Sequence, residues 1–401
     1  MDFNLNNLSR IDKDAKNVFE VSAPYYLFNS ENSQPQKSIA IFFGCDFKNL
    51  PAGTNIKRFI EITNECLDFV RRECSDCELY YRPHPAETDE FLSLNLSQFI
   101  IEKDKVVGEY FLYKNYKQVK YIFSAFSTIS MSGYSLGLNA YVFLPLFEAA
   151  FNTAAVNGYR QYLEGMPSAF FLGDLDKKLE KNHMPLVRDE NLKKQWTAIL
   201  KNNTGTAWFI VDDPGFLPII ISIGKLITSI MPGRKLGLIT MRHRRWELID
   251  HKDLAEDFDK IVFFPLVVHS FKPRQLYKLL KTIILVKKFN LASNDILVGV
   301  GPSSYHVNCF ISYYPKNFSV GVVRKKNFDL THNFELPVGP ADYQIKPTAY
   351  FFNKIIEPLL GLYKTVQRVE WPGGRGAFAI SRFQKAINRV FDVTYVVRPL
   401  A

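Results

Sequence analysis

The sequence is poor in cysteine, and this excludes two classes of protein. Five cysteines in 401 residues, an odd number at scattered positions, argue against a disulfide framework and favour a reducing compartment. Cys74 and Cys77 form a CxxC pair, but a structural zinc site needs two more ligands at a matching spacing, and the sequence offers none. The pair is either a thioredoxin-like redox motif or two ordinary thiols at a helix end, and we favour the ordinary thiols.

Long apolar runs are also missing. Residues 1–14 are polar and lack the apolar core of a signal peptide. The longest apolar stretch, Phe216–Met231, has about 16 residues and contains Lys225, whereas a bilayer span needs about 20. This stretch predicts a buried helix. We therefore expect a cytoplasmic protein, with peripheral contact to the inner face of the cell membrane left open.

Acidic residues are outnumbered, with 40 Asp and Glu against 50 Lys and Arg, which gives a net charge of +10. A basic surface attracts nucleic acid, anionic lipid or phosphorylated substrates. Because no nucleic-acid motif accompanies the charge, we expect nucleotide phosphates or an anionic membrane as partners, and no nucleic acid. The densest basic run, 242–245, either binds an anionic acceptor or lipid phosphate, or is a solvated helix start.

What the sequence does contain is an alternation of short apolar strands and amphipathic helices. Strands are predicted at 38–44, 78–85, 99–103, 120–123, 139–144, 235–240, 260–268, 295–301 and 318–323, and helices at 55–72 and 273–289. Such alternation predicts an α/β fold with parallel sheets and right-handed crossovers. A polar stretch at 174–206 divides the chain into two Rossmann-like domains, 1–200 and 201–401.

The strand at 78–85 ends in the first candidate motif, Arg82-Pro83-His84-Pro85. Ligands of open parallel sheets bind beyond the carboxyl ends of the strands. The prolines stiffen the turn, so His84 can donate to a phosphate or protonate a leaving phosphate, and Arg82 can clamp a phosphate. Alternatively, His84 only caps a turn. Gly44, which ends the preceding strand, belongs to the same candidate site.

A second candidate motif follows the strand at 120–123. Ser124, Ser127 and Thr128 are small hydroxyl residues placed where the strand gives way to a helix. Unpaired backbone N–H groups and the helix dipole favour an anion at such a point. Ser127 and Thr128 are equally good helix caps, and capping is the alternative interpretation.

The two motifs together resemble those of bacterial sialyltransferases and polysialyltransferases. The resemblance rests on His84-Pro85 and Ser127-Thr128, covers 38–147, and extends to capsule and lipooligosaccharide transferases that use CMP-activated sugars or CDP-glycerol. It implies a GT-B architecture in which 1–200 binds the nucleotide sugar and 201–401 is the acceptor-type domain. It also implies that the histidine and the Ser/Thr pair hold the CMP phosphate.

Those families also use an acidic-acidic-Gly motif, whose carboxylate is the general base, in an acceptor domain that precedes the donor domain. Here the nearest match, Asp212-Asp213-Pro214-Gly215, lies near the domain junction. His306 and Glu370 are further candidates for the base, because His306 follows the strand at 295–301 and Glu370 precedes a Gly-rich stretch. The displaced motif suggests either a permuted domain order or a degenerate enzyme.

The resemblance implies inverting, metal-independent transfer of a sialic-acid-like sugar from a CMP donor to a surface glycan or glycolipid. No cofactor is expected, since no DxD-like metal motif stands near a strand end and Arg, His and Ser/Thr contacts would neutralise the phosphate. A CDP-glycerol or CMP-Kdo transferase of capsule synthesis is the nearest alternative. A catalytically degenerate glycan-assembly or glycan-binding protein is the alternative from another class.

Overall fold

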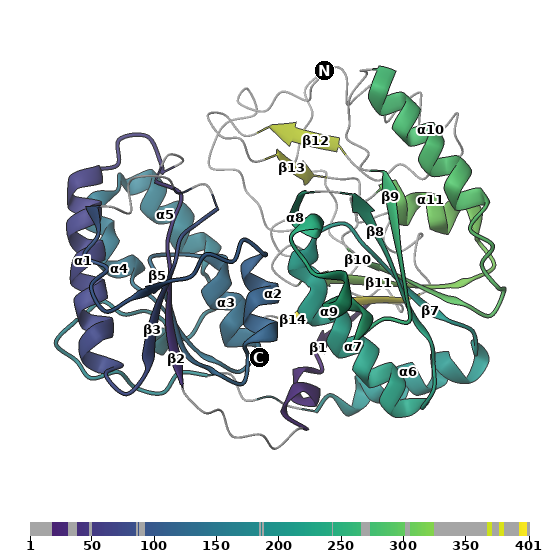
Figure 1. The fold of residues 1–401 in the computed structure, drawn as a ribbon, viewed down its shortest axis with the longest axis horizontal. Coiled ribbons are helices and arrows are strands. Elements are labelled where there is room, and N and C mark those ends of the chain that lie inside the picture. The colour runs from purple at the N-terminus through teal and green to yellow at the C-terminus, as the bar shows by residue number, and fades with distance from the viewer. Residues whose placement is uncertain are drawn as a thin grey trace. The chain divides into compact units, whose positions relative to one another are not determined.

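The computed structural model forms two compact units. It describes residues 18–30, 38–47, 50–85, 87, 93–183, 186, 188–242, 244–265, 273–300, 305–324, 367–370, 377–380 and 393–398. One unit is Phe28–Val187, and the other is Arg188–Arg398 together with the chain before Phe28; we call them the 28–187 unit and the 188–398 unit. Each is built on its own parallel sheet (Figure 1). The contacts thus divide the chain near residues 28 and 188, whereas the sequence predicts one division at 200.

The sheet of the 28–187 unit has five parallel strands in the order β4-β3-β2-β5-β6. Their bounds are Ile39–Phe43 (β2), Glu78–Arg82 (β3), Ile100–Ile101 (β4), Val119–Ser124 (β5) and Asn139–Val142 (β6). All five strands predicted for this half are confirmed. The chain builds outward from β2 on one side and then crosses to β5 on the other side. The sheet therefore changes direction between β2 and β5.

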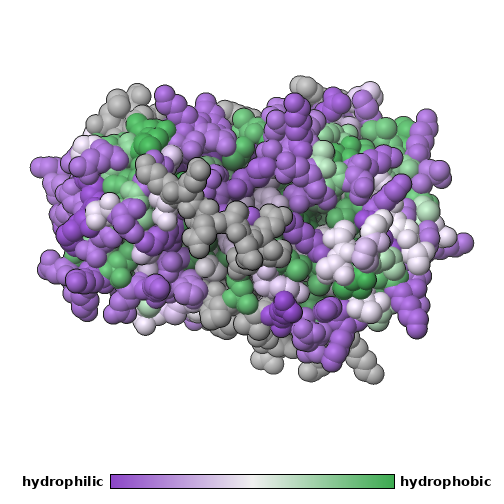
Figure 2. Space-filling view, turned by 60° about the horizontal axis from the view of Figure 1, so that its bottom comes forward, coloured by the Kyte–Doolittle hydropathy of each residue, from purple (hydrophilic) through white to green (hydrophobic). Residues whose placement is uncertain are grey.

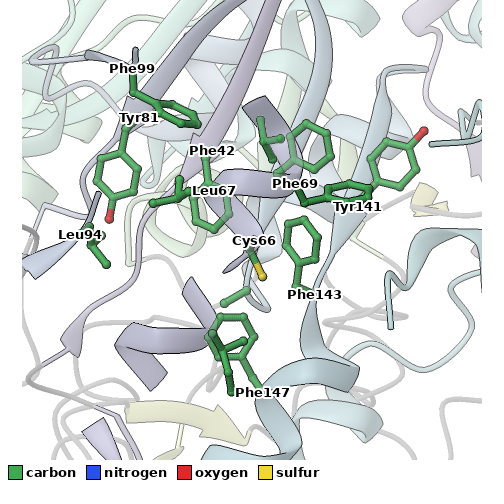
Figure 3. Close-up of a cluster of buried hydrophobic side chains, with 14 of the residues drawn as sticks. Phe42, Cys66, Leu67, Phe69, Tyr81, Leu94, Phe99, Tyr141, Phe143 and Phe147 are labelled. Atoms are coloured by element: carbon green, nitrogen blue, oxygen red, sulfur yellow. The ribbon is translucent and has the colours of Figure 1, made fainter. Parts of the chain in front are cut away.

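Aromatic side chains fill the core of this unit. Phe42, Phe123 and Tyr141 come from the neighbouring strands β2, β5 and β6, and Phe143 directly follows β6. The four rings stack in near-parallel pairs with ring centroids 5.4–6.1 Å apart. Figure 3 shows Phe42, Tyr141 and Phe143 of this layer, and Phe143 contacts Phe69 of helix α1 (Ile56–Glu73). Aromatic residues make up 14% of the sequence, and these four serve in packing; truncating one such ring costs about 3–5 kcal/mol.

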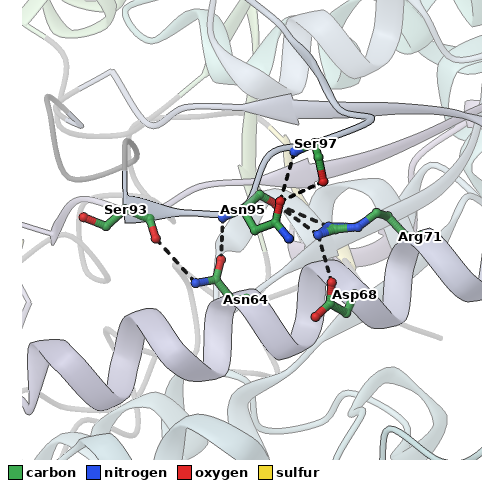
Figure 4. A network of polar contacts seen from close by, with 6 residues as sticks. All are labelled: Asn64, Asp68, Arg71, Ser93, Asn95 and Ser97. Atoms are coloured by element: carbon green, nitrogen blue, oxygen red, sulfur yellow. Dashed lines mark hydrogen bonds and ion pairs between the residues drawn. The ribbon is translucent and has the colours of Figure 1, made fainter.

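Helix α1 also anchors the segment that leads into β4. Asn64 accepts a hydrogen bond from the backbone N–H of Asn95 at 2.7 Å, and both Nη atoms of Arg71 donate to the Asn95 carbonyl (Figure 4). Asp68 forms an ion pair with Arg71 at 2.8 Å. The helix itself begins at an Asn55 cap, whose side chain accepts from the N–H of Arg58. These contacts hold the chain downstream of the His84 loop.

The sheet of the 188–398 unit has seven parallel strands in the order β1-β14-β11-β10-β7-β8-β9. Their bounds are Val18–Ser22 (β1), Ala207–Val211 (β7), Leu236–Arg242 (β8), Lys260–Pro265 (β9), Ile296–Val300 (β10), Phe318–Arg324 (β11) and Val393–Arg398 (β14). The order from β9 to β14 is that of a Rossmann sheet, which changes direction between β7 and β10. The four predicted strands are confirmed. Strands β1, β7 and β14 were not predicted.

A separate antiparallel pair, β12 (Gln367–Glu370) and β13 (Ala377–Ile380), completes the described strands of this unit. Among the described residues, six α-helices accompany the seven-stranded sheet: α6 (Glu190–Asn202), α7 (Leu217–Ile230), α8 (Arg244–Glu247), α9 (His251–Ala255), α10 (Pro273–Lys287) and α11 (Tyr305–Tyr313). Ten of the 14 residues of α7 are buried, so the helix predicted within Phe216–Met231 is confirmed. Together the two sheets form an α/β fold that is compatible with two Rossmann-like domains.

The surface of the protein is mostly polar on the face drawn in Figure 2. There, hydrophilic residues cover most of the coloured surface and hydrophobic residues appear as separate patches between them. None of the helices in the described part of the chain combines the length and the apolar character that a bilayer span requires.

Candidate functional site

The first candidate site lies at the carboxyl end of the five-stranded sheet. Strand β2 runs between β3 and β5, and its last residue, Phe43, pairs with Arg82 on one side and Ser124 on the other. The chain segments after Arg82 and after Ser124 therefore leave the sheet at the same end, two strand spacings apart, which is about 10 Å. This is where the sheet changes direction, and it is where open α/β sheets bind ligands.

Glu87 fixes the loop that carries His84. Its Oε1 accepts a hydrogen bond from the Tyr81 hydroxyl at 2.6 Å, and its Oε2 accepts from the backbone N–H of His84 at 2.8 Å. Burial, and next the negative charge of Glu87, raise the pKa of Tyr81 well above its usual range, so the phenol keeps the proton that it donates. The imidazole of His84 itself is exposed. The loop is thus held by its backbone, while the ring stays accessible.

Gly44 packs against this carboxylate. Its N–H donates to the Arg82 carbonyl at 2.9 Å. A Cβ at this position would collide with Oε2 of Glu87 and lie 2.5 Å from the Tyr81 hydroxyl. The structure therefore gives Gly44 a definite role, which is to leave room for the carboxylate that fixes the His84 loop.

Gly44→Ala is expected to lower the free energy of unfolding by about 1–3 kcal/mol, because a methyl group there must displace the Glu87 carboxylate or the Tyr81 hydroxyl and so weaken the bonds that Glu87 accepts. Urea denaturation measures this change. The matched control is Gly158→Ala in α5 (Thr153–Tyr162), where a new Cβ meets nothing within 4 Å. Because alanine favours helix, the control should gain up to about 1 kcal/mol. A Gly44→Ala protein as stable as the parent would contradict this role.

Arg82 lies deeper than the sequence predicts. Only 5% of it is exposed, its Nη2 donates to the Val106 carbonyl at 2.5 Å, and its guanidinium carbon lies 4.3 Å from the centre of the Phe111 ring. These contacts hold helix α2 (Gly108–Lys114) against the end of the sheet. Burial lowers the pKa of Arg82, although the nearby acidic side chains oppose the shift. Its Nη1 is buried without a hydrogen-bond partner among the described residues, so a role in phosphate binding stays a prediction.

The Ser124–Thr128 segment is built as a helix cap. Ser124 is fully buried; its Oγ lies 2.8 Å from Ser130 Oγ and accepts from the N–H of Ser127 at 3.0 Å. Ser127 caps helix α3 (Thr128–Ser135), accepting from the N–H of Ile129 at 3.3 Å. The capping interpretation is therefore confirmed for Ser127, whereas Thr128 is the first residue of α3. Capping also aligns the first turn of α3, whose dipole favours an anion at this end of the sheet.

The CxxC pair has the structure of two ordinary thiols. Cys74 is buried at the end of α1, and the N–H of Cys77 donates to the Cys74 carbonyl at 2.9 Å. Burial, together with the charge of Asp76, raises the pKa of Cys77 to about 11, and burial also raises the pKa of Cys74. Because a redox-active CxxC pair needs a lowered thiol pKa, these shifts disfavour the thioredoxin-like interpretation.

Alkylation of Cys77 by iodoacetamide at pH 8 is expected to be slower than that of free cysteine by one to two orders of magnitude, because little thiolate is present so far below a pKa of about 11. Mass spectrometry of the modified peptide follows the reaction. Raising the pH toward 11 should accelerate it, and the urea-unfolded protein should react at the rate of free cysteine. A Cys77 that reacts at that rate in the folded protein would argue for an activated thiol.

The second candidate site lies at the carboxyl end of the seven-stranded sheet. Asp212 directly follows β7, and His306 lies in the first turn of α11, which follows the neighbouring strand β10. Oδ1 of Asp212 lies 3.6 Å from Nδ1 of His306, and Nε2 of His306 lies 3.0 Å from the Pro265 carbonyl at the end of β9. The structure thus brings together two predicted base candidates where this sheet changes direction.

The geometry of this pair fixes one proton of His306. The Pro265 carbonyl can only accept a hydrogen bond, so Nε2 of His306 must donate to it. Nδ1 then faces a carboxylate oxygen, and that contact is favourable only when the imidazole is charged or Asp212 is protonated. Only 2% of the His306 side chain is exposed, against 26% for Asp212. Asp212 is therefore the member of the pair that a ligand can reach, and His306 lies behind it.

Neighbouring side chains hold Asp212 and Asp213 differently. The Asp212 carbonyl accepts from the Trp246 indole N–H at 2.9 Å. Oδ1 of Asp213 accepts from the N–H of Gly215 at 2.9 Å, and its Oδ2 lies 3.6 Å from Nη1 of Arg245. Asp213 and Arg245 are each more than half exposed, and such surface pairs contribute about 0–1 kcal/mol. Asp213 thus caps a turn and forms an ion pair with Arg245, one arginine of the predicted basic run.

The remaining predicted site residues are placed as follows. Pro85 is exposed beside His84, and Thr128 is half-buried at the start of α3. Glu370 ends β12, but its side chain lies outside the described residues. In the described ranges, no group of three His, Cys, Asp or Glu side chains lies close enough to hold a metal ion. No protein-family model, curated protein or solved structure matches this chain.

Proposed function

We propose that this protein is a glycosyltransferase that uses a nucleotide-activated sugar. The observation that carries the proposal is the carboxyl end of the five-stranded sheet. There, an exposed histidine on a loop fixed by Glu87 and the capped start of α3 leave the sheet on either side of β2. A hydrogen-bonding imidazole and a helix amino terminus, placed where the sheet changes direction, together suit the phosphate of a nucleotide.

In this proposal His84 and α3 bind the phosphate that leaves with the nucleotide. As the bond between the anomeric carbon and the phosphate oxygen breaks, negative charge grows on that oxygen. Donors aimed at this charge stabilise the transition state without a metal ion. Burial of Arg82 under α2 makes His84 the more accessible of the two side chains at the end of β3. The resemblance described above supports CMP as the nucleotide, an acidic sugar as the transferred group and a GT-B architecture.

Asp212 is proposed as the general base and His306 as its positioning residue. The base takes the proton of the acceptor hydroxyl while that oxygen attacks the anomeric carbon, which inverts the configuration. Oδ1 of Asp212 is buried and has no hydrogen-bond partner among the described residues, and it lies 3.6 Å from Nδ1 of His306. The imidazole thus orients the carboxylate from its buried side. The more exposed part of the carboxylate remains for the acceptor.

A donor screen tests this function. CMP-sialic acid, CMP-Kdo, CDP-glycerol and a UDP-sugar are each incubated with a panel of glycan acceptors, and nucleotide release is measured. Acceptor-dependent release of CMP is the expected result, and the donor that gives it identifies the transferred group. Binding of CMP without release from any donor would favour the degenerate glycan-binding alternative. Failure to bind any of the nucleotides would overturn the proposal.

A further inference from the structure

Helix α10 is apolar on two sides, one buried and one exposed. Its inner side places Ile283 and Val286 in the core of the 188–398 unit. Its outer side carries Tyr277, Leu280 and Ile284, which are 64%, 50% and 52% exposed. The spacing of three and four residues places these three on one side of the helix, next to the side that carries the buried pair. A helix that only covers a sheet is polar on its outer side, so this stripe marks an interaction surface.

The charged side chains of α10 and the next residue, Lys288, all carry positive charge. Lys281 and Lys288 are exposed on the same side as Ile284, and Lys278 borders the stripe. The residues of α10, PRQLYKLLKTIILVK, include no acidic residue. The amine of Lys287 lies 4.8 Å from the centre of the Tyr313 ring, so this lysine is directed toward α11. The partner of the outer side must therefore accept both apolar side chains and positive charge.

From this combination we infer that the outer side of α10 docks on an anionic lipid surface. An interfacial helix lies in the plane of the membrane with its apolar side chains among the acyl chains and its lysines at the headgroups. The helix of 15 residues is about 22 Å long, which suits such a position. Helix α10 follows β9, which is an edge strand of the sheet, and it lies beside that strand (Figure 1). The net charge of +10 adds long-range attraction to the same surface.

Co-sedimentation with vesicles tests this inference on the full chain. We expect the protein to pellet with vesicles of phosphatidylcholine and phosphatidylglycerol, and much less with phosphatidylcholine alone. Leu280→Gln/Ile284→Gln should lower the affinity at least tenfold, because it removes two apolar side chains from the acyl region. Lys281→Gln should lower it about fivefold, the effect of one lysine near an anionic surface.

The matched control is Ile56→Gln, because Ile56 is also an exposed isoleucine but lies at the start of α1. The nearby Arg58 is paired with Glu61 and Glu65. It should bind like the parent, and circular dichroism should show all variants folded. Equal binding to neutral and anionic vesicles, or no binding to either, would overturn the inference. So would a protein dimer, seen by sedimentation velocity, that Leu280→Gln/Ile284→Gln converts to monomers, because the stripe would then join two copies of the chain.

Discussion

His84→Ala is expected to lower turnover of the CMP-activated donor by about 10²- to 10⁴-fold while the protein stays folded. The ring is exposed, and the loop is fixed through the backbone N–H of His84, which alanine retains. The substitution therefore removes the group that contacts the leaving phosphate and leaves Glu87 bonded to Tyr81. Steady-state rates of CMP release measure the loss, and urea denaturation measures the stability.

His183→Ala is the control for this experiment. His183 is also exposed, but it follows Asn182, whose N–H donates to the side chain of Asn139 at the first residue of β6. It therefore lies at the amino end of the same sheet, away from the proposed phosphate site. The control should keep the parent rate. Unchanged turnover in folded His84→Ala would remove this histidine from the mechanism.

Asp212→Asn is expected to have a loss of similar size, about 10²- to 10⁴-fold in turnover, because an amide cannot take the proton of the acceptor hydroxyl. Asparagine keeps the shape of the side chain, and the Asp212 carbonyl still accepts from Trp246. Nucleotide affinity, measured by calorimetry, should stay at the parent value, since the phosphate site belongs to the other sheet. Loss of turnover without loss of CMP binding is therefore the signature of the missing base.

The matched control for this variant is Glu256→Gln, which neutralises an exposed carboxylate at the end of α9 in the same unit. It should behave as the parent protein. A second variant, His306→Gln, tests the positioning role, because it should lower kcat through a misoriented Asp212 while the KM for the donor stays at the parent value. Parent-like turnover in Asp212→Asn would exclude this carboxylate as the base and leave Asp213, His306 and Glu370 as the candidates.

Local sequence pattern was sufficient for most of the strands. Strands β2 and β3 are apolar runs that end at a glycine or at prolines, so their positions were predictable. Strand β7, five buried residues, was missed because it follows directly on a polar stretch that was assigned to the domain boundary. Strands β1 and β14 pair although they lie near opposite ends of the chain. Such long-range pairing leaves no periodic signal.

The candidate sites were predictable in their residues but not in their contacts. Parallel strands place all their carboxyl ends together, so Arg82 and Ser124 could be assigned to one end of a sheet. The sequence alone could not show that β2 separates these two residues or that Arg82 is buried under α2, because both depend on packing. The role of Glu87 was missed as well, and the only signal for it was an acidic residue three positions after His84.

The contacts of the second candidate site could not be predicted from the sequence either. Asp212 and His306 were each expected after a strand, but their contact depends on β7 and β10 being neighbours. Periodicity indicates that strands exist, and only the order of the sheet determines which loops meet. The burial of His306, which makes Asp212 the accessible member of the pair, follows from the packing of α11.

The position of bound CMP tests the central claim most directly. A crystal structure of the protein soaked with CMP should show its phosphate at the start of α3, within hydrogen-bonding distance of the Ser127–Thr128 backbone and of the His84 imidazole. The same phosphate bound at any other place on the chain, with the two loops beside β2 left empty, would contradict the account.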